Sequence, residues 1–252
     1  MINIEDIKSI ALEAGDAIME IYENDFQGKQ AFAVEYKDDK SPLTKADLKS
    51  NEIICKRLTE LYPKIPILSE ENKEVAYKER KNWEYYWCID PIDGTKEFIK
   101  KNGEFTVNIA LIHKNKPVLG VVYAPVLNDI YFAKEGFGAF KNNTKLPIKR
   151  DDDKFIIVVS KSHMSDETQK YIDEIKTKKE KVLISKGSSL KLCLVAEGLA
   201  DIYPRLAPTM EWDTAAAHAV VLESGKQVVE YETNSAIQYN KKDLLNPWFI
   251  VK

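Results

Sequence analysis

Asp90-Pro91-Ile92-Asp93-Gly94-Thr95 follows directly after the apolar run 85–89, which is typical of a buried strand. The two carboxylates therefore stand at a strand end, three residues apart, and the proline stiffens the backbone between them. Two carboxylates about 4 Å apart repel by roughly 4 kcal/mol at an effective dielectric of about 20. A hard divalent cation removes this repulsion because it prefers oxygen ligands. The stretch therefore predicts a metal site suited to phosphate chemistry.

Two further acidic segments indicate the same site. The apolar run 65–68 leads into Glu70, and Trp212-Asp213-Thr214-Ala215-Ala216 follows far downstream. Taken alone, each piece has a simpler explanation: Asp-Gly is a common turn, Glu70 suits a strand that leaves for solvent, and Asp213 suits a helix N-terminus. Two buried strands that both end in acids nevertheless favour one shared cation site.

Gly94 and Thr95 predict how a phosphate is held. A short helix over residues 95–99 would begin directly after the glycine. The first N–H groups of a helix have no partner within the helix and bind phosphate oxygens, and the Thr95 hydroxyl would orient a water.

Together, Glu70-Glu71, the stretch 90–95 and the stretch 212–216 resemble the three-part signature of the inositol monophosphatase superfamily of lithium-sensitive, Mg²⁺-dependent phosphatases. The resemblance spans the whole chain. It implies an α+β / α/β fold, the layered αβαβα sandwich of the inositol monophosphatase (sugar phosphatase) type, with two or three Mg²⁺ ions as the cofactor.

The same resemblance implies roles for individual residues. The expected metal ligands are the side chains of Glu70, Asp90, Asp93 and Asp213 and the backbone carbonyl of Ile92. Thr44-Lys45-Ala46-Asp47 is similar to the family's Thr-x-Ala-Asp element, so Asp47 and Thr95 are the expected catalytic residues, which position and activate the attacking water. From the residues alone, Asp47 reads equally well as a first-turn acid that interacts with the helix dipole.

Longer strings resemble the 3′(2′),5′-bisphosphate nucleotidases of that superfamily, namely 94–100, 102–112, 187–191 and 193–198. The implied reaction is hydrolysis of the 3′-phosphate of adenosine 3′,5′-bisphosphate to AMP and phosphate, with the sulfated compound as a further substrate. The expected partner is a small-molecule nucleoside bisphosphate. The residues expected to contact it are Glu70, Ile92, Asp93, Gly94, Thr95, His163, Ser188, Ser189, Lys191, Arg205 and Asp213.

Other functions stay open at this point. An inositol monophosphatase or another small sugar-phosphate phosphatase would share every metal ligand, and only the strings 96–100 and 187–191 favour the nucleotide. A catalytically silent nucleotide or metal sensor would need a broken ligand set, and this sequence breaks none of it. Arg, Lys and a helix that starts with serine suit phosphate, although His163 and Arg205 read equally well as ordinary surface residues.

Composition indicates a soluble enzyme that does not bind nucleic-acid polymers. The 252 residues are 44% hydrophobic and 31% charged, with a formal net charge of −3. A protein that binds a polyanion usually has a basic face, which this charge balance does not favour. We expect neither a signal peptide nor a transmembrane segment. Peripheral association with the cytoplasmic face of the inner membrane stays open, and so does the oligomeric state. Cys55, Cys88 and Cys193 lack zinc or redox spacing and favour a cytoplasmic location.

Periodicity predicts the order of the elements. Helices are expected near 7–21, 44–61, 95–99, 165–177, 188–197 and 212–224, and strands near 65–68, 85–89, 105–112, 117–123, 129–133, 155–160, 182–185, 201–203, 227–231 and 248–251. Residues 25–41 read as an exposed loop, and the family resemblance implies that this loop lies near the active site. The charged connector 149–153 predicts a boundary. An N-terminal α+β domain, 1–150, would carry most metal ligands and the phosphate loop, and a C-terminal α/β domain, 151–252, the last ligand and the nucleotide-specificity residues.

Overall fold

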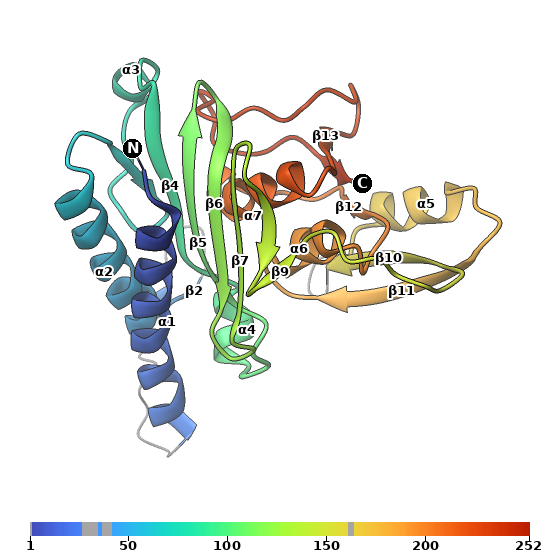
Figure 1. Cartoon of the computed structure of the whole chain (residues 1–252), viewed down its shortest axis with the longest axis horizontal. Coiled ribbons are helices and arrows are strands. Elements are labelled where there is room, and N and C mark those ends of the chain that lie inside the picture. The colour runs from blue at the N-terminus through green and yellow to red at the C-terminus, as the bar shows by residue number, and fades with distance from the viewer. Residues whose placement is uncertain (1, 27–34, 37–41, 161–163) are drawn as a thin grey trace.

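The computed structural model describes residues 2–26, 35–36, 42–160 and 164–252 of the chain. Layers of helix and sheet alternate across it, from α1 and α2 at one side to α5 at the other (Figure 1). This is the predicted αβαβα sandwich. Most of the predicted loop 25–41 lies outside the described residues. Residues 25 and 26 belong instead to the helix α1 (Ile4–Phe26), and Glu35–Tyr36 form β1, which pairs with β2 (Pro42–Leu43).

The first layer consists of α1 (Ile4–Phe26) and α2 (Lys45–Leu61). Apolar residues at helical spacing, among them Ile7, Ile10 and Ile18, are fully buried against the sheet. Thr44 caps α2, because its hydroxyl accepts the N–H of Ala46 while the Asp47 carboxylate accepts the N–H of Thr44. The bonds that start α2 therefore also fix the position of Asp47.

The central sheet has the strand order β3-β4-β5-β6-β7-β8-β9. Its strands are β3 (Ile67–Ser69), β4 (Tyr85–Asp93), β5 (Thr106–His113), β6 (Lys116–Ala124), β7 (Asp129–Lys134), β8 (Gly138–Lys141) and β9 (Thr144–Lys145), with α3 (Tyr77–Arg80) and α4 (Thr95–Ile99) in the connections. Only β3 and β4 pair in parallel within this sheet, with Ser69 opposite Ile89. Their carboxyl ends therefore meet at one edge, and the Glu70 N–H donates to the Ile89 carbonyl at 3.1 Å.

The second helical layer, α6 (Leu190–Glu197) and α7 (Glu211–Glu223), covers the other face of the sheet. The backbone of α7 approaches β6 at Gly120, where an added Cβ would lie 2.1 Å from the Ala216 carbonyl oxygen. The alanines that follow Asp213 are buried at this crossing. Small side chains on α7 thus allow this close approach.

The outer sheet is built from the second half of the chain. Strand β10 (Lys154–Ser160) pairs in parallel with β11 (Glu180–Lys186), and β12 (Tyr203–Arg205), β14 (Phe249–Val251) and β13 (Val228–Glu230) form an antiparallel group. A bridge between Ile157 and Ile202 connects the two groups. Helix α5 (Asp166–Glu174) packs on this sheet through Ile172.

The predicted boundary at 149–153 separates the strands of the two sheets but not the hydrophobic core. One buried cluster contains Leu68 of the first half together with Phe249 of the second. Several element predictions differ in their bounds. The helix expected over 7–21 runs over Ile4–Phe26, and the helix expected over 165–177 ends at Glu174. The strand expected over 65–68 forms at Ile67–Ser69, and the strand expected at 201–203 forms at Tyr203–Arg205. The backbone just before Tyr203 pairs with β10 instead, because the Asp201 N–H donates to the Ile156 carbonyl and the Ile202 carbonyl accepts the Val158 N–H. Pairing with β14 therefore begins only at Tyr203.

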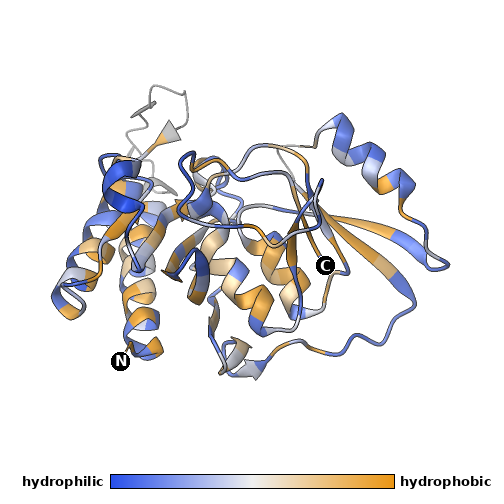
Figure 2. Cartoon of the chain, turned by 90° about the horizontal axis from the view of Figure 1, so that it is seen from above, coloured by the Kyte–Doolittle hydropathy of each residue, from blue (hydrophilic) through white to orange (hydrophobic). Residues whose placement is uncertain are grey.

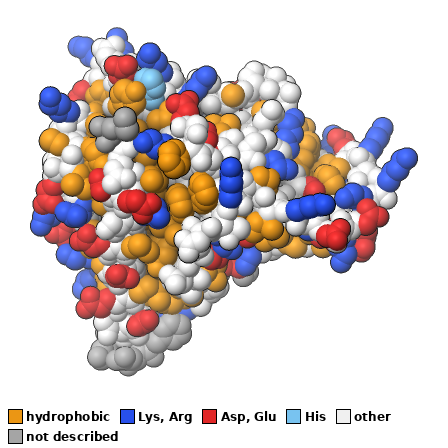
Figure 3. Space-filling model, viewed as in Figure 1, with side chains coloured by type: hydrophobic (Ala, Val, Ile, Leu, Met, Phe, Trp, Pro, Cys, Tyr) orange, Lys and Arg blue, Asp and Glu red, His pale blue; other side chains and the backbone are white. Residues whose placement is uncertain are grey.

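The surface shows mixed charge. Apolar residues concentrate in the middle of the molecule, whereas α5 at the periphery is largely hydrophilic (Figure 2). On the face shown in Figure 3, basic and acidic side chains are interspersed, consistent with the net charge of −3. Among the described residues, no helix combines the length and the apolar composition needed to cross a bilayer.

Candidate active site

Three acidic side chains from three separate segments meet at the edge where β3 and β4 end. Oxygen atoms of Glu70, Asp90 and Asp213 lie within 4.8 Å of one another. Glu70 follows β3, Asp90 belongs to β4, and Asp213 lies in the first turn of α7. The parallel pairing of β3 and β4 brings the first two acids together, and the close approach of α7 to the sheet adds the third.

The electrostatics of this group favour a bound cation. Burial raises the pKa of Asp90 well above its ordinary value, and the negative charges of Glu70, Asp93 and Asp213 raise it further. Burial likewise raises the pKa of Asp213 to about 8, with added repulsion from Asp93 and Glu70. A cation would remove both penalties, and an all-oxygen donor set fits a hard divalent ion such as Mg²⁺.

Backbone hydrogen bonds orient two of these carboxylates. The Asp213 carboxylate accepts the N–H of Met210 at 2.8 Å, and the Asp90 carboxylate accepts the N–H of Ile92 at 3.1 Å. The Ser50 hydroxyl donates to the Pro91 carbonyl at 2.9 Å and so ties α2 to the stretch 90–95. The acids are thus held in place by neighbouring backbone.

Asp93, the fourth predicted side-chain ligand, lies at the end of β4 and lines the same cavity. The Ser189 hydroxyl lies 2.7 Å from the Asp93 carboxylate and 2.9 Å from the Asp213 carbonyl, so its proton is donated to one or the other. Burial raises the pKa of Asp93, while the positive charge of Lys191 and the hydrogen bond from Ser189 act in the opposite direction. The hydroxyl of Ser189, a residue predicted to contact substrate, is thus used by the Asp93 carboxylate and the backbone of α7.

Asp47 and Thr95, the two predicted catalytic residues, are in direct contact. The Thr95 hydroxyl lies 3.1 Å from the Asp47 carboxylate and 3.3 Å from the Ile92 carbonyl, and it donates to one of these oxygens. Asp47 is only 1% exposed, and burial raises its pKa. Gly94 has φ +93° and the short helix begins at Thr95, so the predicted turn and helix are both present.

The acids open into a cavity of about 400 Å³ that is lined by residues from both halves of the chain. Its wall includes the following predicted site residues: Glu70, Asp90, Ile92, Asp93, Gly94, Thr95, Ser188, Lys191, Arg205 and Asp213. Ser189 does not belong to this wall, although its hydroxyl contacts Asp93. His163 lies outside the described residues.

The same cavity contains two buried cations. Lys191 is 7% exposed and Arg205 is 8% exposed. The Lys191 ammonium donates to the Ser188 carbonyl, and Arg205 donates to the Pro208 carbonyl at 2.8 Å. Burial lowers the pKa of Lys191 to about 8, although the nearby Asp93 carboxylate opposes this shift. Both cations are therefore desolvated next to acids, where an anionic ligand would be held strongly.

Ser188 has an unusual conformation on this wall. Its φ is +44°, a region that non-glycine residues seldom adopt, and its buried hydroxyl has no hydrogen-bond partner among the described residues. The Glu104 carboxylate holds the turn before it by accepting the Gly187 N–H at 3.0 Å and by pairing with Lys186 at 3.2 Å. Ser188 therefore lines the cavity, while its hydroxyl oxygen is itself buried.

Sequence reasoning missed two residues that support the site. Asn108 donates to the Ser189 hydroxyl at 2.8 Å, and Glu104 holds Gly187 as described. Both residues belong to the string 102–112 that carried the resemblance, but their partners lie about 80 positions away along the chain. Nothing in the string itself indicates these partners.

Comparison with known proteins places the chain in a family. The model of the inositol monophosphatase family matches residues 3–251. A 3′(2′),5′-bisphosphate nucleotidase CysQ of Salmonella typhimurium is 45% identical over 251 residues, which cover 98% of each chain. The corresponding protein of Haemophilus influenzae is 36% identical, with coverage of 98% of this chain and 91% of the relative.

Solved structures agree with the sequence matches. CysQ from Bacteroides thetaiotaomicron, described as a bacterial member of the inositol monophosphatase family, superimposes with a TM-score of 0.89 at 46% identity, covering 99% of this chain and 96% of that one. An IMPase from Thermotoga maritima has a TM-score of 0.77 at 25% identity, with coverage of 97% and 89%. The predicted family and fold are confirmed. This chain is a member of the inositol monophosphatase family.

Proposed function

We propose that this protein is a 3′(2′),5′-bisphosphate nucleotidase that hydrolyses the 3′-phosphate of adenosine 3′,5′-bisphosphate to AMP and phosphate with the help of Mg²⁺. The observation that carries the proposal is that one cavity combines a candidate cation site with two cationic side chains. Carboxylates suited to a divalent cation lie near two buried cations, Lys191 and Arg205. A substrate with two phosphates uses both, whereas an inositol monophosphate uses one. The similarity to nucleotidases named CysQ supports the same choice.

The proposed ligands are the side chains of Glu70, Asp90, Asp93 and Asp213 and the carbonyl of Ile92, and we propose two or three Mg²⁺ ions. Such ions supply the positive charge that offsets the negative charge of the phosphate during attack. The family is one of metal-dependent phosphatases, and the oxygen cluster fits this dependence. Li⁺ sensitivity is expected to accompany it.

Thr95 and Asp47 are proposed to prepare the attacking water. Because the Thr95 hydroxyl can donate its proton to Asp47, its oxygen lone pairs remain available to accept a proton from a water in the cavity. The raised pKa of Asp47 is in the direction that makes a carboxylate a better proton acceptor. Attack is proposed to be in line and without a phosphoenzyme.

Residues from the second half of the chain are proposed to hold the rest of the nucleotide. Lys191 and Arg205 would bind the other phosphate, and Ser188, which lines the same wall, would contact the substrate. His163 stays a prediction. A cytoplasmic location is proposed as well, and the free thiols of Cys88 and Cys193, buried among apolar residues, support it.

The test compares phosphate release from adenosine 3′,5′-bisphosphate and inositol 1-phosphate, each with Mg²⁺, with chelator and with added Li⁺. A large preference for the nucleotide that chelator abolishes is the expected result. A preference for inositol 1-phosphate would overturn the substrate while keeping the metal site. Release that persists fully in chelator would contradict the metal dependence.

A further inference from the structure

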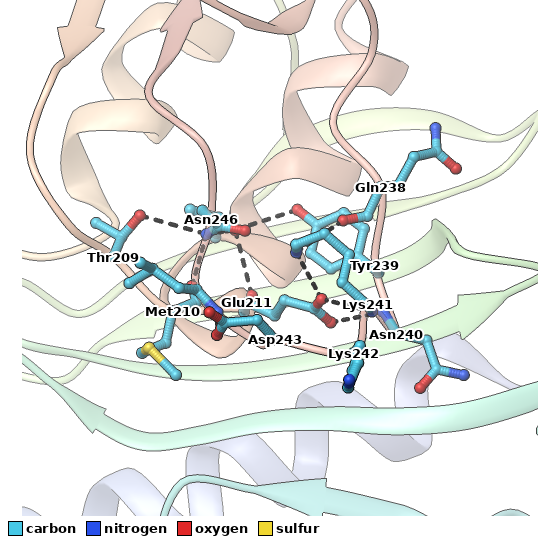
Figure 4. A network of polar contacts seen from close by, with 12 residues as sticks. Thr209, Met210, Glu211, Gln238, Tyr239, Asn240, Lys241, Lys242, Asp243 and Asn246 are labelled. Atoms are coloured by element: carbon cyan, nitrogen blue, oxygen red, sulfur yellow. Dashed lines mark hydrogen bonds and ion pairs between the residues drawn. The ribbon is translucent and has the colours of Figure 1, made fainter. Parts of the chain in front are cut away.

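Residues 238–246, which we call the strap, lie against the start of α7 (Figure 4). Glu211, the first residue of α7, is 0% exposed, and its carboxylate accepts the N–H groups of Asn240 at 2.7 Å and Lys241 at 3.0 Å. The Lys241 ammonium adds an ion pair at 2.6 Å. In return, the Glu211 N–H donates to the Leu244 carbonyl at 3.0 Å. The strap is therefore bound closely to the helix that carries Asp213.

Asn246 ends the strap at the turn that leads into α7. Its side-chain amide nitrogen lies 2.7 Å from the Met210 carbonyl oxygen, 3.1 Å from the Thr214 hydroxyl and 3.3 Å from the Thr209 hydroxyl. Its backbone N–H donates to the Thr209 carbonyl at 2.8 Å. Asn246 is 4% exposed, so water does not readily replace these bonds.

Met210 connects Asn246 to the proposed cation site. Its carbonyl accepts from the Asn246 amide, while its N–H donates to the Asp213 carboxylate at 2.8 Å. One residue thus receives a bond from the strap and gives a bond to the ligand. A shift of the Met210 backbone would turn the Asp213 carboxylate away from Glu70 and Asp90.

We propose that Asn246 is a positioning residue for the divalent-cation site, acting on Asp213 through Met210. The inference rests on the proposed cation site. Groups that orient metal ligands typically change metal affinity by about 10- to 100-fold when they are removed. We therefore expect Mg²⁺ binding to weaken about 10-fold when Asn246 loses its amide.

The test is a calorimetric Mg²⁺ titration of the chelator-treated full chain without substrate. It compares the wild-type protein with Asn246→Ala and Asn246→Leu; the leucine variant keeps most of the side-chain volume if the alanine variant does not fold. The matched control is Asn240→Gly, which removes another buried strap asparagine whose side chain bonds to Arg80 instead of Met210. Glycine also suits its φ of +60°.

The expected result is an Mg²⁺ dissociation constant about 10-fold higher in the folded Asn246 variants and close to wild type in Asn240→Gly. At saturating Mg²⁺, kcat on the bisphosphate should return toward wild type, which a general loss of structure would not allow. Unchanged Mg²⁺ affinity in Asn246→Leu overturns the inference and leaves the proposed function intact, and equal weakening in Asn240→Gly overturns it too. If the wild-type chain binds no Mg²⁺, both the inference and the proposed function fail.

Discussion

At the scale of single residues, the candidate site keeps like charges together out of water. Asp90 is 1% exposed, and burial is the main reason why its pKa is raised. The negative charges of Glu70, Asp93 and Asp213 raise this pKa further. Such an arrangement is unfavourable for the ion-free folded chain. Binding of a cation and stability of the fold must therefore depend on each other at this edge of the sheet.

Replacing Asp213 by asparagine should stabilise the ion-free protein at alkaline pH. Burial raises the folded-state pKa of Asp213 from 3.8 to about 8. The stability contributed by this group is therefore fully present below the lower pKa and is lost as pH rises through the higher one. Asparagine does not titrate, so Asp213→Asn should gain roughly 2 to 4 kcal/mol over wild type between pH 5 and pH 8.

Urea unfolding in chelator at the two pH values measures this gain. A stability difference between variant and wild type that is the same at pH 5 and pH 8 would contradict the assigned pKa. The variant should also bind Mg²⁺ more weakly, which separates its effect on the fold from its effect on the site.

Removing the Thr95 hydroxyl should lower turnover and leave binding nearly unchanged. The hydroxyl contacts Asp47 and lines the cavity, but it is not one of the clustered acids. Thr95→Ala is expected to reduce kcat by about 100-fold or more with little change in KM, because positioned proton-transfer groups contribute about that much. Thr95→Ser, which keeps the hydroxyl, is the control. Steady-state kinetics on adenosine 3′,5′-bisphosphate measure the effect. A higher KM with unchanged kcat in both variants would refute this role.

At the scale of elements, the site depends on how closely α7 approaches the sheet. Gly120 allows this approach, and an alanine there would place its Cβ 2.1 Å from the Ala216 carbonyl oxygen. The helix backbone would have to move, and its first turn carries Asp213. Packing on β6 and geometry of the cation site are therefore connected through one helix.

Gly120→Ala is expected to destabilise the fold by about 3 kcal/mol or more and to weaken Mg²⁺ binding, because a backbone atom blocks the new methyl group. Gly136→Ala is the control: its φ of +75° costs something, but a Cβ there meets nothing within 4 Å. The melting temperature and the Mg²⁺ titration of both variants make the comparison. An equal loss in the two would point to backbone strain rather than to the contact with α7.

Local patterns in the sequence were enough to predict most helices and strands and the acids that follow the strands. Apolar runs identified β3 and β4, and the acids at their ends come together as expected. The meeting of Asp213 with Glu70 could be inferred only through the family resemblance, because no local pattern relates residues so far apart. Asn246 was not predicted, since a single asparagine has no periodicity and its partner Met210 is distant in the chain.

Ser189 illustrates a different limit. A serine before a helix beside a lysine is a good phosphate contact by residue type, but its hydroxyl is used by the Asp93 carboxylate and the Asp213 carbonyl. Ser188, next to it, lines the cavity with a φ of +44°, a conformation that the residue type does not favour. Residue type therefore does not tell which of two adjacent serines lines the cavity, because the backbone there follows a turn that Glu104 holds through the Gly187 N–H.

At the scale of the whole molecule, the cavity is lined by both halves of the chain, and the two halves share a hydrophobic core. A cation held by acids of both halves should therefore stabilise the entire fold. Mg²⁺ at 100 times its dissociation constant should raise the free energy of unfolding by about 2.7 kcal/mol and shift the melting temperature upward.

A thermal shift titration against Asp90→Asn checks this stabilisation. The wild-type melting temperature should rise with Mg²⁺ until it saturates, and the variant should respond weakly. A shift of similar size in both proteins would mean that Mg²⁺ acts elsewhere on the surface.

The parallel pairing of β3 with β4 and the crossing of α7 at Gly120 bring together acids that no short segment contains. Any partly folded form that lacks one of these contacts also lacks a complete ligand set. Such a partly folded form should therefore be inactive. The measured activity of a preparation should be proportional to its number of fully folded molecules.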